Sequence, residues 1–185
     1  MIRATLSAIG VALLLVAFVL VSCSGEEETS HNTSNPRAVP IATPANPATS
    51  ARAPGFSLED LNDNIIDFRQ YDGKVVLIDF WATWCGPCRR SIPHLIDLYY
   101  QHKSEGLEIV GISLDRAGKS TVRKYVDQMK IPYPIVMGSR EVAINWQIGQ
   151  AIPLAILVDR EGHIVGRFLG YQDKSILEAA ILKFL

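Results

Sequence analysis

The stretch VVLIDFWATWCGPCRRSIP, residues 75–93, decides the fold predicted from this sequence. Its first seven residues are apolar except for Asp79 and rich in β-branched side chains, which is typical of a strand buried on both faces. From Cys88 to Ser104, apolar residues recur at helical spacing, and the pattern stops before Gly106. A strand therefore leads directly into a helix, and two cysteines lie at the junction.

The rest of residues 55–185 extends this unit into an α/β domain. The pattern predicts a second buried strand, three further helices and a terminal antiparallel hairpin. These elements are strand 107–114, a helix capped by Ser120 or Thr121 and running to Met129, a short helix near 139–147, strands 154–159 and 163–169, and helix 174–184 capped by Asp173. The expected architecture is a central mixed sheet flanked by helices, with one inserted helical segment.

Composition limits the classes of function. The chain has 185 residues, 48% of them hydrophobic and 20% charged, and a net charge of −1. This composition is typical of a globular domain and lacks the basic surface that nucleic-acid binding requires, so we expect no nucleic-acid partner. Its three cysteines, at positions 23, 85 and 88, are too few for a disulfide-rich scaffold or a four-thiolate zinc site.

The first 54 residues predict export and attachment to a membrane. Residues 1–22 have a short positive end followed by an apolar run, as in a secretory signal peptide, and the ending Leu-Val-Ser-Cys23 resembles the lipobox of bacterial lipoproteins. An uncleaved membrane anchor is the alternative. Residues 23–54 form a Pro-, Ser-, Thr- and Ala-rich linker. We therefore expect a membrane-anchored lipoprotein, lipidated on Cys23, whose domain (55–185) lies on the periplasmic or extracytoplasmic side.

The Cys85-Gly-Pro-Cys88 pair carries the predicted chemistry. A cysteine at a helix N-terminus faces free backbone N–H groups and the positive end of the helix dipole, which stabilise a thiolate. Cys85 should therefore act as the nucleophile, and Cys88, one turn further along, should resolve the mixed disulfide. Pro87 fits the first turn, where its missing N–H is not needed.

Other uses of a Cys-x-x-Cys pair fit this sequence less well. A zinc site would need two more ligands, and His31, His94, His102 and His163 show no paired spacing. Arg89 replaces the histidine of a covalent haem motif. A purely structural disulfide would be strained and exposed at this position. Redox exchange is the interpretation that agrees with the strand, the turn and the helix together.

Residues 79–93 are similar to the active-site block of thioredoxins. The extra helical stretch near 115–131, the leader and Ile152-Pro153 look more like the membrane-tethered TlpA/ResA branch of thiol-disulfide oxidoreductases, and the similarity covers about residues 54–185. The resemblance implies a thioredoxin fold, protein-disulfide oxidoreductase activity and a redox centre without a cofactor or metal.

The resemblance also implies roles for individual residues. Pro153 matches the family's cis-proline, and Asp79 matches a buried carboxylate that could take the proton from Cys88. A satisfied polar residue in a strand is the alternative for Asp79. The implied substrate-binding surface consists of Trp84, Gly86, Pro87, Ile152 and Pro153, with the backbone of Ile152 pairing with the substrate peptide.

The expected partners are disulfide-containing exported proteins. The Gly-Pro spacer favours a reductant, because thioredoxin-type pairs lie near about −270 mV and strong oxidants near about −120 mV. Recycling would then need a transmembrane thiol donor of the DsbD/CcdA type, and cytochrome c maturation is one implied pathway. However, Ser91 occupies a position where many TlpA/ResA-like proteins carry a glutamate proposed to recognise apocytochrome c, and Leu154 one where threonine is common, so this client stays open.

Two rival functions remain for comparison. A peroxiredoxin-like antioxidant peroxidase would place its cysteine in a P-x-x-x-T-x-x-C pattern, but residues 80–85 contain no such proline. A copper(I)-binding chaperone module could use Cys85 and Cys88 as soft ligands.

Overall fold

The structure is a computed structural model that describes residues 51–185. The predicted signal peptide, Cys23 and the linker up to residue 50 lie outside the described residues. Within residues 51–185, no helix combines the length and the apolar character needed to cross a membrane.

A five-stranded mixed sheet forms the centre of the fold, with strand order β5-β4-β3-β6-β7. Its three middle strands are fully buried, as their apolar runs predict, and β3 is the central one. β3 pairs in parallel with β4, which pairs in parallel with β5; β6 is antiparallel to both β3 and β7. The strands are β3 (Val75–Trp81), β4 (Leu107–Ser113), β5 (Ile135–Met137), β6 (Leu154–Val158) and β7 (Ile164–Leu169).

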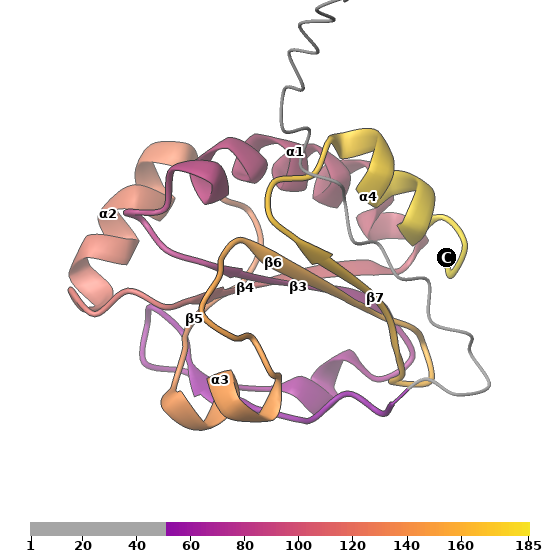
Figure 1. Cartoon of the computed structure of the whole chain (residues 1–185), viewed down its shortest axis with the longest axis horizontal. Helices are drawn as coiled ribbons and strands as arrows, with labels where there is room; N and C mark the ends of the chain where they lie inside the picture. The colour runs from indigo at the N-terminus through magenta and orange to yellow at the C-terminus, as the bar shows by residue number, and fades with distance from the viewer. Residues whose placement is uncertain (1–50) are drawn as a thin grey trace, which may run out of the picture. The chain divides into compact units, whose positions relative to one another are not determined.

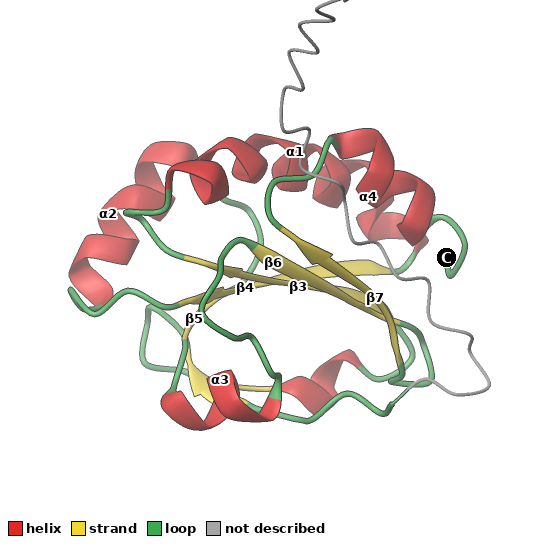
Figure 2. Ribbon diagram, in the orientation of Figure 1, coloured by secondary structure: helices red, strands yellow, loops and turns green. Residues whose placement is uncertain are grey.

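Helices cover both faces of this sheet (Figures 1 and 2). Helices α1 (Gly86–His102), α2 (Lys119–Met129) and α4 (Lys174–Ile181) lie on one face. The opposite face carries helix α3 (Arg140–Asn145), the hairpin of β1 (Ser57–Glu59) and β2 (Ile65–Asp67), and the 3-10 helix η2 (Phe68–Tyr71). A second 3-10 helix, η3 (Lys103–Glu105), continues α1.

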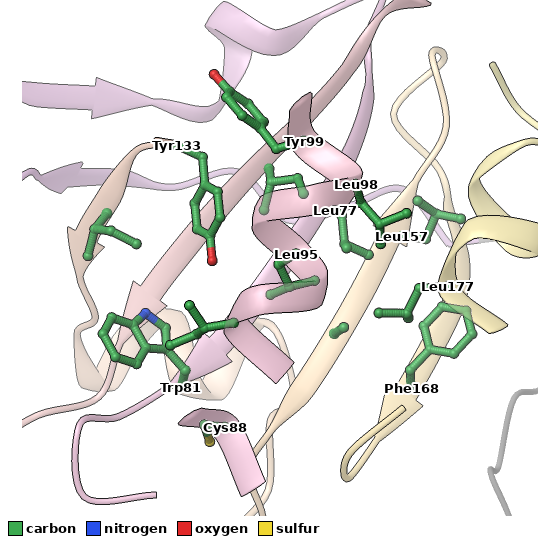
Figure 3. Close-up of a cluster of buried hydrophobic side chains, with 14 of the residues drawn as sticks. Leu77, Trp81, Cys88, Leu95, Leu98, Tyr99, Tyr133, Leu157, Phe168 and Leu177 are labelled. Atoms are coloured by element: carbon green, nitrogen blue, oxygen red, sulfur yellow. The ribbon is translucent and has the colours of Figure 1, made fainter. Parts of the chain in front are cut away.

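The side chains of β3 alternate between two hydrophobic cores. Leu77 and Trp81 join the cluster under α1, α2 and α4 that also contains Cys88 (Figure 3). Ile78 and Phe80 join the cluster on the α3 face. Because successive side chains of a strand point to opposite faces, Asp79 points to the same face as Leu77 and Trp81. Helix α1, which carries Cys88, therefore packs on the sheet face to which Asp79 points.

Three strands were missed in the sequence. β1, β2 and β5 have three residues each, too few for a periodic pattern to be distinguished from a loop. β5 follows Pro134 and is stabilised by pairing with residues 111–113 of β4, a contact that local sequence does not reveal. The segment between α2 and α3 therefore completes the sheet at its edge, where we had expected only an inserted helical segment.

Several boundaries also differ from the prediction. α2 begins at Lys119 after Gly118, whose φ of 88° turns the chain, and the hydroxyl of Thr121 donates instead to the carbonyl of Ala117. The prediction that Ser120 or Thr121 caps this helix is therefore wrong. Asp173 is the N-cap residue of α4, although its side chain makes no capping hydrogen bond, and α4 ends at Ile181.

The folded region includes residues that we had assigned to the linker. Arg52 forms an isolated bridge with His163, and the Ala53 N–H donates to the carbonyl of Gly162 at 2.8 Å. The Ile164 N–H donates to the carbonyl of Ala51 at 2.9 Å. These contacts place residues 51–53 against the β6–β7 hairpin, ahead of the expected start at residue 55.

Candidate active site

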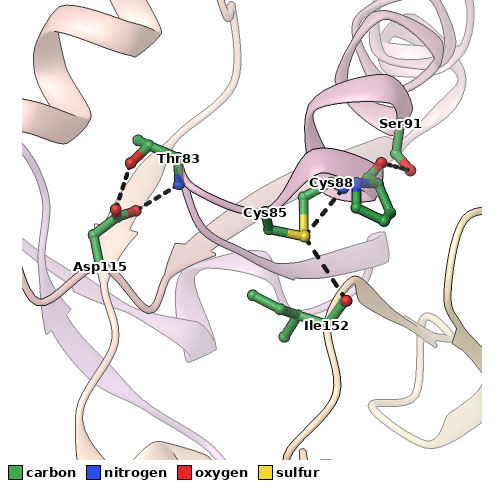
Figure 4. Close-up of a disulfide and its surroundings, with 7 residues drawn as sticks. Thr83, Cys85, Cys88, Ser91, Asp115 and Ile152 are labelled. Carbon is green, nitrogen blue, oxygen red and sulfur yellow. Dashed lines mark hydrogen bonds between the residues drawn. A yellow bond between two sulfur atoms is a disulfide. The ribbon is translucent and has the colours of Figure 1, made fainter.

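The two cysteines lie where β3 passes into α1, and they form a disulfide (Figure 4). Cys85 is the N-cap residue of α1, and the N–H of Cys88 donates to Cys85 Sγ across 3.2 Å. Helix α1 starts at Gly86, two residues before its predicted start, so Pro87 lies in the first turn. The first turn of the helix therefore directs a backbone donor at the sulfur predicted to be the nucleophile.

The two sulfurs differ in their surroundings. Cys88 is completely buried, whereas Cys85 keeps 5% of its surface exposed, and Gly86 and Pro87 between them are exposed. Trp84, immediately before Cys85, is 69% exposed. Only the Cys85 side of the pair therefore borders the surface that a protein substrate could reach.

The loop before β6 approaches the disulfide from the opposite side. The Ile152–Pro153 peptide bond is cis, as the resemblance implied. Cys85 Sγ lies 3.8 Å from the carbonyl oxygen of Ile152 (Figure 4). β3 and β6 are antiparallel, so the start of β6 adjoins the end of β3, and this register brings two segments 67 residues apart into contact.

Asp79 is a buried carboxylate in the middle of β3, 2% exposed. Its strand partners are small residues, Gly111 on β4 and Ala155 on β6. Burial raises the pKa of Asp79 from 3.8 to about 7. Burial, with the charge of Asp79 as a further contribution, also holds the pKa of Tyr133 well above 10.0. Asp79 thus combines a raised pKa with a place on the sheet face that α1 and Cys88 cover.

A hydrogen-bonded network that no sequence pattern predicts supports the loop before Cys85. Asp115, which follows β4, accepts hydrogen bonds from the N–H of Thr83 at 2.9 Å and from its hydroxyl. It also accepts one from the hydroxyl of Ser113 at 2.9 Å. The only available signal was position: the C-terminal ends of two adjacent parallel strands meet at one sheet edge, so a polar residue there lies near the redox loop.

Ser91 is buried and does not present a free polar group to the cysteines. Its hydroxyl donates to the carbonyl of Pro87 at 3.3 Å, inside the first turns of α1 (Figure 4). Among residues 51–185, no group of three or more His, Cys, Asp and Glu side chains is arranged to hold a metal ion.

A cysteine pair at the start of a helix, opposite a cis-proline loop on a thioredoxin fold, defines a thioredoxin-like protein-disulfide oxidoreductase. Residues 49–167 match the AhpC/TSA family, and the chain belongs to that family. It is similar to thiol-disulfide oxidoreductase ResA of Bacillus cereus, with 30% identity over 71% of this chain and 75% of the relative. The ResA of Halalkalibacterium halodurans is 33% identical over 69% of this chain and 72% of its own.

Solved structures agree with this assignment. The thioredoxin domain of a thiol-disulfide oxidoreductase from Bacteroides vulgatus is 30% identical, with a TM-score of 0.64 over 71% of this chain and 96% of that one. A thiol:disulfide interchange protein from Bacteroides sp. is 29% identical, with a TM-score of 0.65 over 74% of this chain and 89% of that one.

Proposed function

We propose that Cys85 and Cys88 reduce disulfides in exported proteins by two successive exchange steps. The observation that carries this proposal is the N-cap position of Cys85, whose sulfur accepts the N–H of Cys88 while Cys88 itself is buried. A backbone donor aimed at sulfur favours the thiolate once the disulfide is reduced, and the thiolate is the attacking species.

The electrons and protons of this reaction balance as follows. The Cys85 thiolate attacks one sulfur of the client disulfide, and the other client sulfur leaves as a thiolate that takes up a proton. Cys88 then loses its proton and attacks Cys85 Sγ, which releases the second client thiol. The protein dithiol is oxidised to the Cys85–Cys88 disulfide, and the client disulfide is reduced to two thiols.

Two neighbouring groups support these steps. Asp79 faces the α1 side of the sheet and titrates near neutral pH, so it can accept the proton that Cys88 must lose. The carbonyl of Ile152, close to Cys85 Sγ, is a backbone acceptor that an extended client peptide could use. Trp84, Gly86 and Pro87 supply exposed surface around the same sulfur.

The direction and the location of the reaction are part of the proposal. We assign the protein as a reductant, because of its Gly-Pro spacer, and as a lipoprotein held by Cys23 outside the cytoplasm, because of residues 1–23. Its oxidised pair would then be reduced by a transmembrane dithiol donor of the DsbD/CcdA type. Apocytochrome c remains one client to be tested.

Trapping tests the proposal. In a Cys88→Ser variant of the full chain, the second step cannot occur, so Cys85 should remain joined to its client, and mass spectrometry of the adduct identifies that client. Cys85→Ser is the matched control and should trap nothing. An empty Cys88→Ser trap, adducts only with cytosolic proteins, or a measured reduction potential above about −150 mV would contradict the proposal. Steady hydrogen peroxide turnover by Cys88→Ser would favour a peroxidase instead.

A further inference from the structure

A pocket of about 370 Å³ opens beside the cysteine pair. Helix α1 contributes Gly86, Arg89 and Arg90 to its lining, and α2 contributes Tyr125 and Met129. Gly86 lies between the two cysteines in sequence, so a side chain in this pocket would belong to a residue close to the reacting disulfide of a bound client. We refer to these five residues as the Arg-Tyr pocket.

Each arginine of this pocket lies over the ring of a tyrosine. Cζ of Arg89 lies 5.8 Å from the ring centre of Tyr125 on α2. Cζ of Arg90 lies 5.5 Å from the ring centre of Tyr171, in the loop between β7 and α4. Stacking on an aromatic ring restricts an arginine side chain before any ligand arrives, so less conformational entropy is lost on binding. The two guanidinium groups are therefore partly preorganised next to the redox site.

The positive charge of the pocket is not neutralised locally. No acidic residue lines it, and neither Arg89 nor Arg90 forms an ion pair with another of the residues 51–185. The whole chain carries a net charge of only −1, so this charge is a local feature rather than a general property of the surface. The apolar parts of Tyr125 and Met129 provide a wall for the carbon atoms of an incoming side chain.

We infer that the Arg-Tyr pocket binds an acidic side chain of the client, adjacent to the disulfide that Cys85 attacks; this inference rests on the proposed function. A guanidinium group matches a carboxylate in charge and in paired hydrogen-bond geometry. Because both arginines are exposed, the preference should be moderate and should weaken with added salt. The pocket thereby selects among disulfide-containing clients by charge.

Two matched peptides test this specificity. Each is closed by one disulfide, and they differ only in having Glu or Gln beside one cysteine. We expect reduced wild-type protein to show a kcat/KM about threefold to tenfold higher for the Glu peptide at low ionic strength, with the difference lost at about 1 M salt. In the double variant Arg89→Gln, Arg90→Gln the ratio should fall to about one.

The ratio of the two kcat/KM values separates charge recognition from the reactivity of the cysteines, because both peptides react with the same Cys85. Arg123→Gln is the matched control: Arg123 lies on α2, which carries Tyr125 and Met129, but it donates to Asn62 and does not line the pocket, so this variant should keep the wild-type ratio. Equal rates for the two peptides with wild-type protein, or a ratio that survives in the double variant, would overturn the inference. Failure to reduce either peptide would instead count against the proposed function.

Discussion

At the scale of single residues, the site depends on how burial changes two side chains. Cys88 has no exposed surface and is bonded to the sulfur of Cys85. Asp79 is almost as deeply buried, and desolvation alone moves its pKa into the range where it gains and loses a proton at neutral pH. A strand position that would normally carry an apolar side chain thus holds an acid.

The raised pKa of Asp79 has a cost in stability that depends on pH. The folded state holds the proton more tightly than the unfolded state, so stability is highest below about pH 4 for this group and falls until about pH 7. Asp79→Asn should therefore raise the free energy of unfolding above pH 7, by up to about 4 kcal/mol, with little effect near pH 4. Chemical denaturation of the oxidised proteins at both pH values measures this.

The same variant should impair catalysis while it improves stability. If Asp79 accepts the proton of Cys88, Asp79→Asn should slow release of the mixed disulfide about tenfold or more and remove the inflection near pH 7 from the rate profile. An unchanged pH profile would show that Asp79 takes no part in proton transfer.

At the scale of elements, two loops at one edge of the sheet act together. β3 and β4 are parallel neighbours; the loop after β3 leads into the cysteine pair at the start of α1, and the loop after β4 contains Asp115. Asp115 accepts hydrogen bonds from the backbone N–H and the hydroxyl of Thr83, two residues before Cys85. It also accepts one from the hydroxyl of Ser113. The position of Cys85 therefore depends on a residue 30 positions further along the chain.

Removal of the Asp115 carboxylate should loosen the redox loop. Asp115→Ala leaves the half-buried donors of Thr83 and the buried hydroxyl of Ser113 without their acceptor, which should lower the free energy of unfolding by about 1–3 kcal/mol. It should also change the equilibrium constant for disulfide exchange with glutathione, which a purely structural contact far from the site would not affect. Asp97→Ala, an exposed acid on α1, is the matched control and should leave both quantities near wild type.

At the scale of the whole domain, His102 joins the end of α1 to α4. Its Nδ1 lies 2.9 Å from Glu105 in η3, and its Nε2 lies 3.0 Å from Glu178 in α4. The hydrogen bond with Glu105, helped by that with Glu178, raises the pKa of His102 above 6.5. Because the histidine side chain is nearly buried, this pair of contacts fastens the closing helix to the redox helix.

The contribution of His102 to the free energy of unfolding should decrease as the histidine loses its proton. It is fully present below pH 6.5 and is lost as the pH rises through the raised pKa of the folded state. The free energy of unfolding of wild type should therefore exceed that of His102→Gln by about 1 kcal/mol near pH 5.5, and by clearly less near pH 9. A difference independent of pH would mean that the imidazolium charge contributes nothing.

The sequence by itself predicted the features that depend on neighbouring residues. The buried runs of β3, β4 and β6 and the spacing in α1 appear as local patterns, and the Cys-Gly-Pro-Cys pair lies within four positions. Resemblance to known proteins added Pro153 and Asp79. These features sufficed for the fold class and for the place of the cysteine pair at the start of α1.

Only the tertiary structure decided what distant segments do to one another. The contact between Ile152 and Cys85, the support of Thr83 by Asp115, the raised pKa of Asp79 and the pocket between α1 and α2 all need a strand register or a helix packing that no local pattern encodes. The physical reason is that the desolvation and the hydrogen-bond partners of a residue are set by its neighbours in space. Those neighbours are established only when the strands have paired and the helices have packed on the sheet.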